Sequence, residues 1–239
     1  MPKRLPRMMG RNSLLSTLSP EDQSLITPSL EDVPLPQGMI LEQSGLPVET
    51  IVFPLSGTIS VTVSSARRMQ TIETGIVGSE GMSGTSTLLN AAVPSQNLYV
   101  QIPGHALQIS AAKLKTLLKQ SLGLQQHFLR FAHVLMTQTA HTAFASRYGT
   151  LEERLARWLL MCHDRVHADK LSLTHQAISV MLAVRRPGVT VATQVLEGKG
   201  LIRATRGEIQ ITDRDGLEAV AGDYYGSPES EYRAVFKAR

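Results

Sequence analysis

The pattern of apolar and polar positions is most informative between residues 173 and 211, where it predicts two helices followed by a β-hairpin. Thr174 is a good N-cap for the first helix, and Pro187 suits the first turn of the second, which ends at Gly198 or Gly200. A turn at residues 183–184 separates the helices, and apolar runs at 201–202 and 209–211 flank a turn at 204–207. The positions that we expect to be buried are Ala177, Ile178, Met181 and Leu182 in the first helix and Val191, Val195 and Leu196 in the second.

This order of elements is that of a winged helix-turn-helix, whose second helix enters the major groove of DNA. The charge of the region agrees, because it carries five basic residues and one acid, Glu197, between positions 185 and 206. The basic residues are Arg185, Arg186, Lys199, Arg203 and Arg206. The first two open the second helix, where an arginine can bond a guanine bidentately, and the other three are placed for phosphates. We predict DNA binding, with the solvated face of an ordinary helical domain as the alternative.

Residues 12–111 have the pattern of an all-β module. Thr58 to Val63 alternate with period two, which predicts a half-buried strand. Many short strands at this spacing favour a jelly-roll or similar barrel, preceded by a short helix from residue 13 and a second helix start at Ser19. The apolar runs lie at residues 39–41, 50–53, 58–63, 71–72, 98–102 and 106–109, between turns rich in glycine, proline and serine.

The middle of the chain changes to a helical rhythm. One helix is predicted from about residue 110 to 119 and a longer one from about 122 to 146, and Thr150 with Glu153 forms a capping box that opens the next. The long helix has alternating spacings of four and three, which predicts the seam of a two-stranded coiled coil; an amphipathic helix lying on its own β-domain is the alternative. The seam residues are Leu124, Phe128, Phe131, Leu135, Gln138 and Thr142.

A β-barrel, a long helix and a C-terminal winged helix-turn-helix in this order resemble the cyclic-AMP receptor protein/FNR (Crp/Fnr) family of transcription regulators. The resemblance is strongest in LTHQAISVMLAVRRPGVTVATQVLEGKGLI and the following RGEIQITDRDGLEAVAG. It implies an α+β protein that binds a palindromic operator as a homodimer and works with RNA polymerase. Arg185, Arg186 and Thr190 match base-reading positions, and Thr174 and Gln176 match phosphate-contacting ones. It divides the chain into a β-roll (1–111), a dimerisation helix region (112–148), a DNA-binding domain (149–222) and a tail (223–239).

The effector region departs from the pattern of members that bind cyclic AMP. Those members present a Gly-Glu pair for the ribose and an Arg-Ser pair for the cyclic phosphate. Here Glu80 is retained after a serine, whereas Gln96 and Asn97 fall where the Arg-Ser pair is expected. Neither side chain is cationic, so the phosphate lacks a charge-assisted partner. We therefore expect a signal other than cyclic AMP, or none, acting through a pocket at Glu80, Gln96 and Asn97.

The distribution of charged, glycine and apolar residues gives further indications of organisation and location. The net charge of +4 at pH 7 divides into a basic arm (1–11), an acidic stretch (12–111) and a basic stretch (112–148), which suggests separate duties. We expect the arm to be disordered. Glycines recur every three residues from 75 to 84, as turn glycines or, less specifically, a phosphate loop. No apolar stretch could span a bilayer and no export signal is evident, so we expect a cytoplasmic protein.

The sequence shows few residues that could bind a metal or a cofactor or act in catalysis. The single cysteine, Cys162, lies in an apolar run and is expected to be buried and inert. With His163 and His167 it falls one ligand short of a convincing zinc site, and the sequence indicates no metal, no cofactor and no enzyme chemistry. Two other functions stay open. One is a cyclic-nucleotide-type regulatory module of an enzyme, which leaves residues 173–211 unexplained. The other is a non-sensing architectural DNA-binding dimer.

Overall fold

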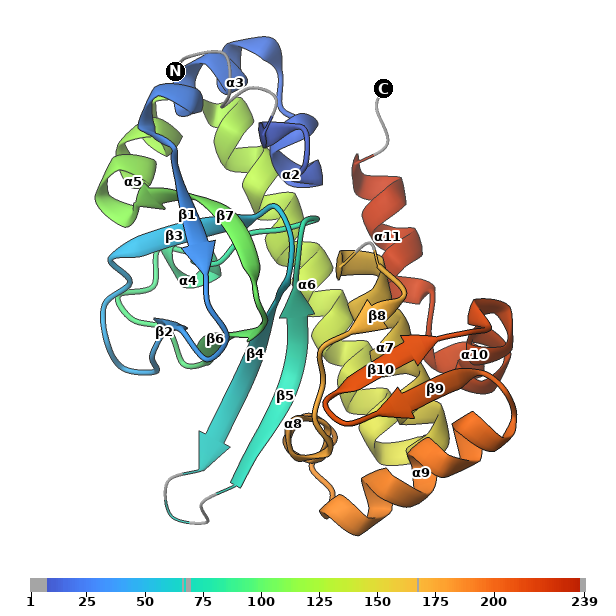
Figure 1. Ribbon diagram of the computed structural model, residues 1–239. Coiled ribbons are helices and arrows are strands. Elements are labelled where there is room, and N and C mark those ends of the chain that lie inside the picture. The colour runs from blue at the N-terminus through green and yellow to red at the C-terminus, as the bar shows by residue number, and fades with distance from the viewer. Residues whose placement is uncertain (1–7, 66, 68–69, 167, 237–239) are drawn as a thin grey trace.

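A β-roll of two sheets, one long helix, and a C-terminal half of helices with a small third sheet make up the fold of the computed structural model (Figure 1). The structure describes residues 8–65, 67, 70–166 and 168–236. The predicted N-terminal arm, Arg68 and His167 therefore lie wholly or mainly outside the described residues. This mixed architecture of a β-sheet domain, a long helix and a C-terminal helix-turn-helix is the predicted one. No helix among the described residues has the length and apolar character needed to cross a membrane.

The N-terminal half is a β-roll of two antiparallel sheets with strand orders β1-β7-β3 and β2-β6-β4-β5. Ser19 caps α3 by accepting from the Asp22 amide, as its sequence predicts. The elements are α2 (Ser13–Ser16), α3 (Pro20–Ile26), η1 (Thr27–Ser29), β1 (Glu31–Leu35), β2 (Ile40–Glu42), β3 (Thr50–Pro54), β4 (Thr58–Ser65), β5 (Gln70–Val77), α4 (Thr85–Leu88), β6 (Asn97–Ile102) and β7 (Gly104–Ser110). The sequence missed β1, because Pro34 marks a turn in most contexts; here it lies on an edge strand, where its missing N–H is tolerated.

Strand β4 is buried on both faces over its first five residues, so the prediction of a half-buried strand is wrong. The polar side chains of Thr58, Ser60 and Thr62 are each at most 2% exposed. The reason is that the second face of the sheet is covered by the C-terminal half. Ser60 Oγ lies 3.4 Å from the sulfur of Met181, which belongs to the first helix of the helix-turn-helix.

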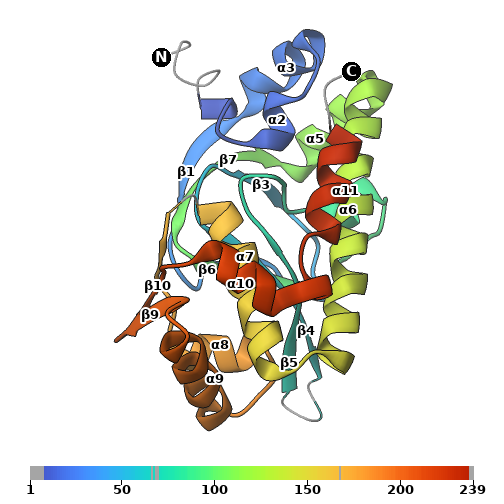
Figure 2. The same cartoon turned by 90° about the vertical axis from the view of Figure 1, so that its right-hand side faces the viewer.

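The long helix is α6 (Leu122–Tyr148), which follows α5 (Ala111–Gln120) and runs the length of the molecule (Figures 1 and 2). The prediction that these positions of α6 form the seam of a two-stranded coiled coil is wrong. Leu124, Phe128, Phe131, Leu135 and Gln138 are at most 9% exposed because they pack on the β-roll of the same chain. Thr142, the sixth, is half-buried and accepts a hydrogen bond from Arg157. The alternative, an amphipathic helix lying on its own β-domain, describes the first five of these residues, whereas Thr142 contacts α7.

Gln138 shows how tightly α6 is joined to the β-roll. Its side-chain amide accepts from the backbone N–H of Ile76 at 2.7 Å and donates to the carbonyl of the same residue at 3.1 Å. A side chain thus takes the place of a neighbouring strand at the edge of β5. A coiled-coil partner would leave these buried backbone groups without hydrogen bonds, which proteins rarely tolerate.

The C-terminal half contains the predicted helix-turn-helix and wing, and the third sheet has the order β8-β10-β9. The capping box is present, since the Thr150 amide donates to Glu153 at 2.7 Å and the Glu153 amide donates to Thr150 Oγ1 at 3.3 Å. The elements are α7 (Leu151–Val166), β8 (Lys170–Leu171), α8 (His175–Met181), α9 (Arg186–Gly198), β9 (Ile202–Thr205), β10 (Glu208–Ile211), α10 (Arg214–Ala221) and η2 (Gly222–Tyr224).

The predicted tail ends in a further helix, α11 (Ser227–Phe236), which lies along α6 (Figure 2). The Tyr232 ring contacts that of Phe236 at 4.7 Å, and the Phe236 ring contacts His127 of α6 at 5.1 Å. A hydrogen bond between His133 and Glu231 adds a polar link at 3.0 Å. Helix α11 therefore returns from the DNA-binding half to the long helix that packs on the β-roll.

Candidate nucleic-acid interface and sensor pocket

Helices α8 and α9 present the geometry of a helix-turn-helix. Thr174 caps α8 by accepting from the Ala177 amide at 3.1 Å, and Pro187 lies in the first turn of α9, both as predicted. The turn between them places Ala183 at φ 51°, a left-handed conformation that is uncommon for a residue other than glycine. The backbone hydrogen bond from Val184 to Ser179 at 2.9 Å closes this turn. This hydrogen bond joins the start of α9 to the end of α8.

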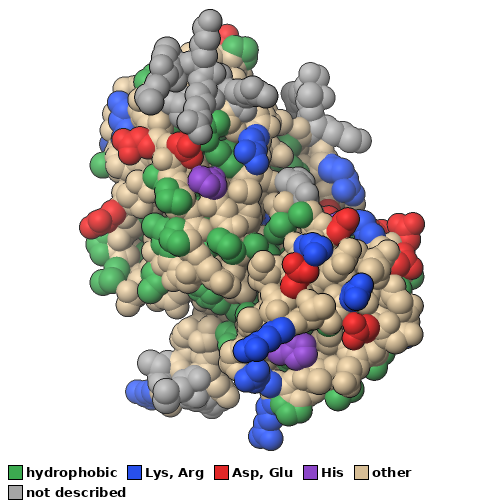
Figure 3. All heavy atoms as spheres, in the orientation of Figure 1, with side chains coloured by type: hydrophobic (Ala, Val, Ile, Leu, Met, Phe, Trp, Pro, Cys, Tyr) green, Lys and Arg blue, Asp and Glu red, His purple; other side chains and the backbone are tan. Residues whose placement is uncertain are grey.

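The two ends of α9 and the wing carry the basic side chains predicted to meet DNA. In Figure 3, blue side chains lie over the lower part of the molecule, where α8, the start of α9 and the β9–β10 turn are found. All five are exposed, and within the described part of the chain none of them forms an ion pair or a side-chain hydrogen bond. They are Arg185, Arg186, Lys199, Arg203 and Arg206. Their charge is free to neutralise phosphates or to bond base edges.

The three polar residues predicted to contact DNA differ in availability. Gln176 is exposed, whereas the hydroxyl of Thr174 already caps α8. Thr190 is half-buried; its hydroxyl donates to the Arg186 carbonyl at 3.2 Å and lies 3.2 Å from His175 Nδ1. Thr190 thus links the two helices, and a base contact from it would have to compete with these bonds.

Two apolar side chains of α9 are not buried, contrary to the sequence prediction. Val191 is 56% exposed and Val195 37%, while the helix packs inward through Val189, Ala192 and Leu196. Of the three positions predicted to be buried, only Leu196 is, because the face that packs inward also contains Val189 and Ala192 and turns Val191 and Val195 toward solvent. The exposed valine of the first two turns adds an apolar surface next to the arginines, of the kind that packs on a thymine methyl group.

The three residues of the predicted effector pocket are not brought together. Gln96 donates to Thr74 at 3.4 Å, and Asn97 accepts from the Ser44 amide at 2.9 Å, both within the β-roll. Glu80 turns the other way and bonds Arg165 Nε of α7 at 2.7 Å. The prediction of one pocket for these residues is therefore wrong, because a buried arginine from the DNA-binding half neutralises Glu80. Glu80 and Arg165 lie 85 residues apart in the chain, so no local sequence signal indicates that they pair.

The glycines from 75 to 84 do not form a phosphate loop, and only Gly84, at φ 79°, has a left-handed backbone. The others let helices approach closely. A Cβ on Gly78 would lie 2.5 Å from Arg165 Cβ, and one on Gly81 would lie 2.3 Å from the Phe131 ring. A Cβ on Gly75 would meet Gln138 at 2.7 Å. Gly75, Gly78 and Gly81 therefore allow close packing between the β-roll and the helices behind it. Neither of the two interpretations from the sequence, turn glycines or a phosphate loop, includes this role.

A second buried carboxylate connects the two halves and was also missed by sequence reasoning. Glu73 of β5 is 4% exposed; it accepts from the Trp158 indole of α7 at 2.6 Å and from Ser60 Oγ at 2.6 Å. Burial raises the pKa of Glu73 to about 7, although these two hydrogen bonds and the nearby Arg157 and Arg165 oppose the shift. This titratable carboxyl lies at the contact between the β-roll and the DNA-binding half.

Cys162 and His163 are buried or hydrogen-bonded within the fold. Cys162 is fully buried, and burial raises the pKa of its thiol well above the usual value. His163 Nε2 lies 3.0 Å from Asp169, and its Nδ1 lies 2.7 Å from Arg214. Over the described ranges, no three His, Cys, Asp or Glu side chains cluster as a metal site.

Comparison with known proteins agrees with this geometry. Residues 153–220 match the family model of the Crp-like helix-turn-helix domain. A protein from Eubacterium rectale described as a transcriptional regulator of the Crp/Fnr family shares 18% identity over 87% of this chain and 97% of its own, with a TM-score of 0.67. The c-di-GMP responsive global regulator CLP of Xanthomonas campestris shares 16% over 81% and 99%, with a TM-score of 0.65. A CRP-family transcriptional regulator of Thermus thermophilus shares 16% over 80% and 97%, with a TM-score of 0.66. No curated protein sequence matches the chain.

The fold and the basic, exposed start of α9 define a helix-turn-helix DNA-binding protein. More specifically, the C-terminal half contains a Crp-like helix-turn-helix domain, and the chain as a whole has the fold of Crp/Fnr-type transcriptional regulators.

Proposed function

We propose that this protein is a sequence-specific transcription regulator that binds an inverted-repeat operator as a homodimer and does not act as an enzyme. The observation that carries the proposal is the pair of exposed arginines at the start of α9, Arg185 and Arg186, which have no partner among the described residues. A structural role would pair such residues with acids, as Lys170 is paired with Glu208 at 3.2 Å. We also propose that the protein acts together with RNA polymerase. A non-sensing architectural DNA-binding protein would have the same DNA-binding residues, and a change in DNA affinity on binding an effector would distinguish a regulator from it.

We expect the full-length protein to select inverted repeats from random duplex DNA, with half-site centres about 10 bp or a multiple of it apart, because two recognition helices enter successive major grooves on one face of the duplex. Selection followed by sequencing, with gel-shift measurements on a single half-site as control, tests this. Full affinity for single half-sites, or no sequence enrichment, would overturn the proposal.

Since the predicted seam is buried, dimerisation must use another face of α6. Met136 is 66% exposed and Phe144 49%, and they lie two turns apart on one side of the helix with the small Ala140 between them. This spacing suits contact with the same helix of a second copy. We infer that this outward stripe is the dimer face.

The dimer face is tested by Met136→Glu, which places a charge where two helices would meet. We expect sedimentation to show a monomer and operator affinity to fall at least tenfold, because burying an unpaired charge is costly. The control is Arg130→Glu on the same helix, an exposed position outside the stripe, which should remain dimeric. Unchanged dimers of Met136→Glu would exclude this face.

Cyclic AMP is not expected to be the effector. Glu80 is occupied by Arg165, and the hydrogen bonds of Gln96 and Asn97 join other parts of the β-roll, so the groups expected to hold ribose and phosphate do not converge. Burying the cyclic phosphate with neutral donors forfeits a charge-assisted bond. Calorimetry and thermal melting should show no response to cyclic AMP. A micromolar dissociation constant that Glu80→Gln abolishes would contradict this expectation.

A further inference from the structure

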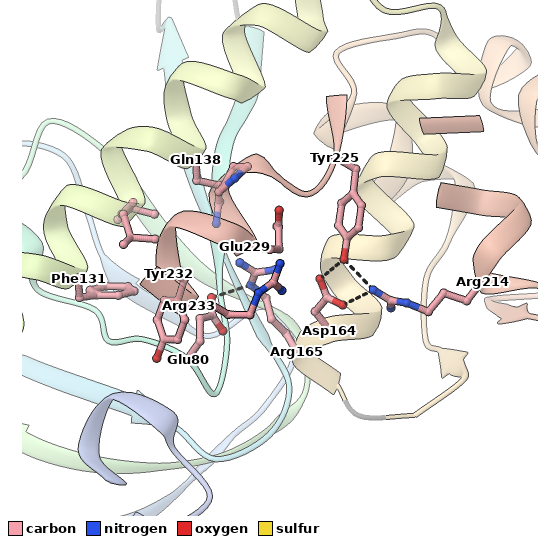
Figure 4. A pocket seen from close by; sticks show the side chains of 13 residues that line it. Glu80, Phe131, Gln138, Asp164, Arg165, Arg214, Tyr225, Glu229, Tyr232 and Arg233 are labelled. Atoms are coloured by element: carbon pink, nitrogen blue, oxygen red, sulfur yellow. Dashed lines mark hydrogen bonds and ion pairs between the residues drawn. The ribbon is translucent and has the colours of Figure 1, made fainter. Parts of the chain in front are cut away.

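A cavity of about 210 Å³ lies where the β-roll, α6, α7 and α11 meet (Figure 4). It is smaller than the 300–1,000 Å³ typical of sites for drug-sized ligands, but it has room for a small organic molecule. Its wall is apolar along α6, where Phe131, Val134 and Leu135 line it, and charged elsewhere. The three acids Glu80, Asp164 and Glu229 and the three bases Arg165, Arg214 and Arg233 give the lining a net charge of zero.

Four of these six charges are paired and form fixed walls. Arg165 bonds Glu80 at 2.7 Å on one side. On the other side, Arg214 bonds Asp164 at 2.8 Å, and the Tyr225 hydroxyl donates to the same carboxylate at 2.7 Å (Figure 4). Charges that neutralise one another in this way have little to offer a ligand.

The other two charges, Glu229 and Arg233, lie one turn apart on α11. A Glu and an Arg at this spacing often form an ion pair, yet these two do not. Glu229 accepts from the Gly226 amide at 3.1 Å through one oxygen, and Arg233 donates to the Ser230 hydroxyl at 2.9 Å. Arg233 is exposed at the edge of the cavity, and within the described ranges it has no carboxylate partner.

Tyr232 of α11 also lines the cavity, and its hydroxyl is buried without a hydrogen-bond partner among the described residues. Buried hydroxyls without a partner are rare in folded proteins. Because this hydroxyl has almost no accessible surface, a ligand in the cavity reaches it only if the Tyr232 ring moves. The cavity itself offers a cation without a carboxylate partner beside a carboxylate that uses one oxygen in a hydrogen bond.

We propose that this cavity binds a free α-amino acid with an apolar side chain. The ammonium group would bond Glu229 and the carboxylate would bond Arg233, so that the ligand bridges two charges that form no ion pair with each other. The side chain would pack against Phe131, Val134 and Leu135. A zwitterion also matches the net charge of the lining, because a ligand with a net charge would leave a charge uncompensated in a partly buried site.

The regulatory meaning of this site rests on the proposed function. The cavity is bounded by α6 of the sensor half, by α7 of the DNA-binding half, and by the α11 helix that follows it, so a ligand there stabilises one arrangement of the three. By linkage, it must then change DNA affinity if the two halves move relative to one another.

The test is titration calorimetry of the full-length protein without DNA, using L-leucine and L-phenylalanine as probes. We expect at least one to bind, and N-acetyl-L-leucine and L-leucinamide, which each lack one charge, to bind at least tenfold more weakly than L-leucine or not at all. Arg233→Gln and Glu229→Gln should each weaken binding at least tenfold. Glu231→Gln, on the same helix but bonded to His133, is the matched control and should bind normally.

Failure of both probes to bind overturns the proposal, and so does equal binding of the singly charged analogues or of the Arg233 variant. Melting temperature of each variant without ligand shows whether the fold is retained. Because the measurement needs no DNA, amino-acid binding by a protein that selects no operator would refute the proposed function and leave the site intact. Operator binding without amino-acid binding would do the reverse.

Discussion

Replacing Arg186 by alanine is expected to weaken binding to the specific operator by about 1–3 kcal/mol, which is roughly 5- to 150-fold in affinity. Arg186 begins α9 and is exposed, with no bonding partner for its side chain among the described residues. An arginine in this place can bond the O6 and N7 atoms of one guanine together, and alanine loses both bonds. The variant should therefore also tolerate base changes at one operator position.

Arg206 provides the matched comparison. It lies in the turn between β9 and β10, where a phosphate contact is expected, and not at the end of the recognition helix. Arg206→Ala should weaken specific and non-specific DNA alike and reduce the slope of log affinity against log salt by about 1. Fluorescence anisotropy at several salt concentrations, on the operator and on scrambled DNA, separates the two effects. If both variants lose only non-specific affinity, base reading by Arg186 is wrong.

Local sequence signals predicted the ends of helices well, because a helix end depends on residues that are close in the chain. The caps at Ser19 and Thr174 and the box at Thr150 and Glu153 are all present. The type and order of the large elements followed from periodicity for the same reason. The strand containing Pro34 was missed because a proline gives the same local signal at an edge strand and in a turn.

Partners across the fold could not be predicted from these signals. The spacing of Phe128 and Leu135 identified the apolar stripe of α6, but a stripe of this kind fits a second helix or a sheet equally well, and the sheet of the same chain covers it. The pairs Glu80–Arg165 and Glu73–Trp158 join residues 85 positions apart. Nothing near either member indicates the other, so the acidic stretch and the DNA-binding half read as separate when they share buried bonds.

The Glu73–Trp158 contact makes the stability of the protein depend on pH. The pKa of Glu73 is raised by burial from 4.5 to about 7, whereas in the unfolded chain it returns to its ordinary value. Below pH 4.5 the carboxyl is protonated in both states. As the pH rises from 4.5 to 7, the unfolded state loses this proton while the folded state keeps it, so the free energy of unfolding falls; above about pH 7 this contribution levels off. The total change is on the order of 3 kcal/mol.

Glu73→Gln is expected to remove this contribution. The glutamine can still accept from the Trp158 indole, and its amide can donate to the Ser60 hydroxyl, so both bonds survive without a titrating group. Chemical denaturation from pH 4.5 to 8 should show the variant gaining relative stability with pH, until it exceeds the parent by a few kcal/mol. Glu21→Gln, at an exposed carboxylate, is the control and should follow the parent. Parallel pH profiles for the parent and Glu73→Gln would show that the pKa of Glu73 is the same in the folded and unfolded states. Only a group that binds protons differently in the two states makes the free energy of unfolding depend on pH.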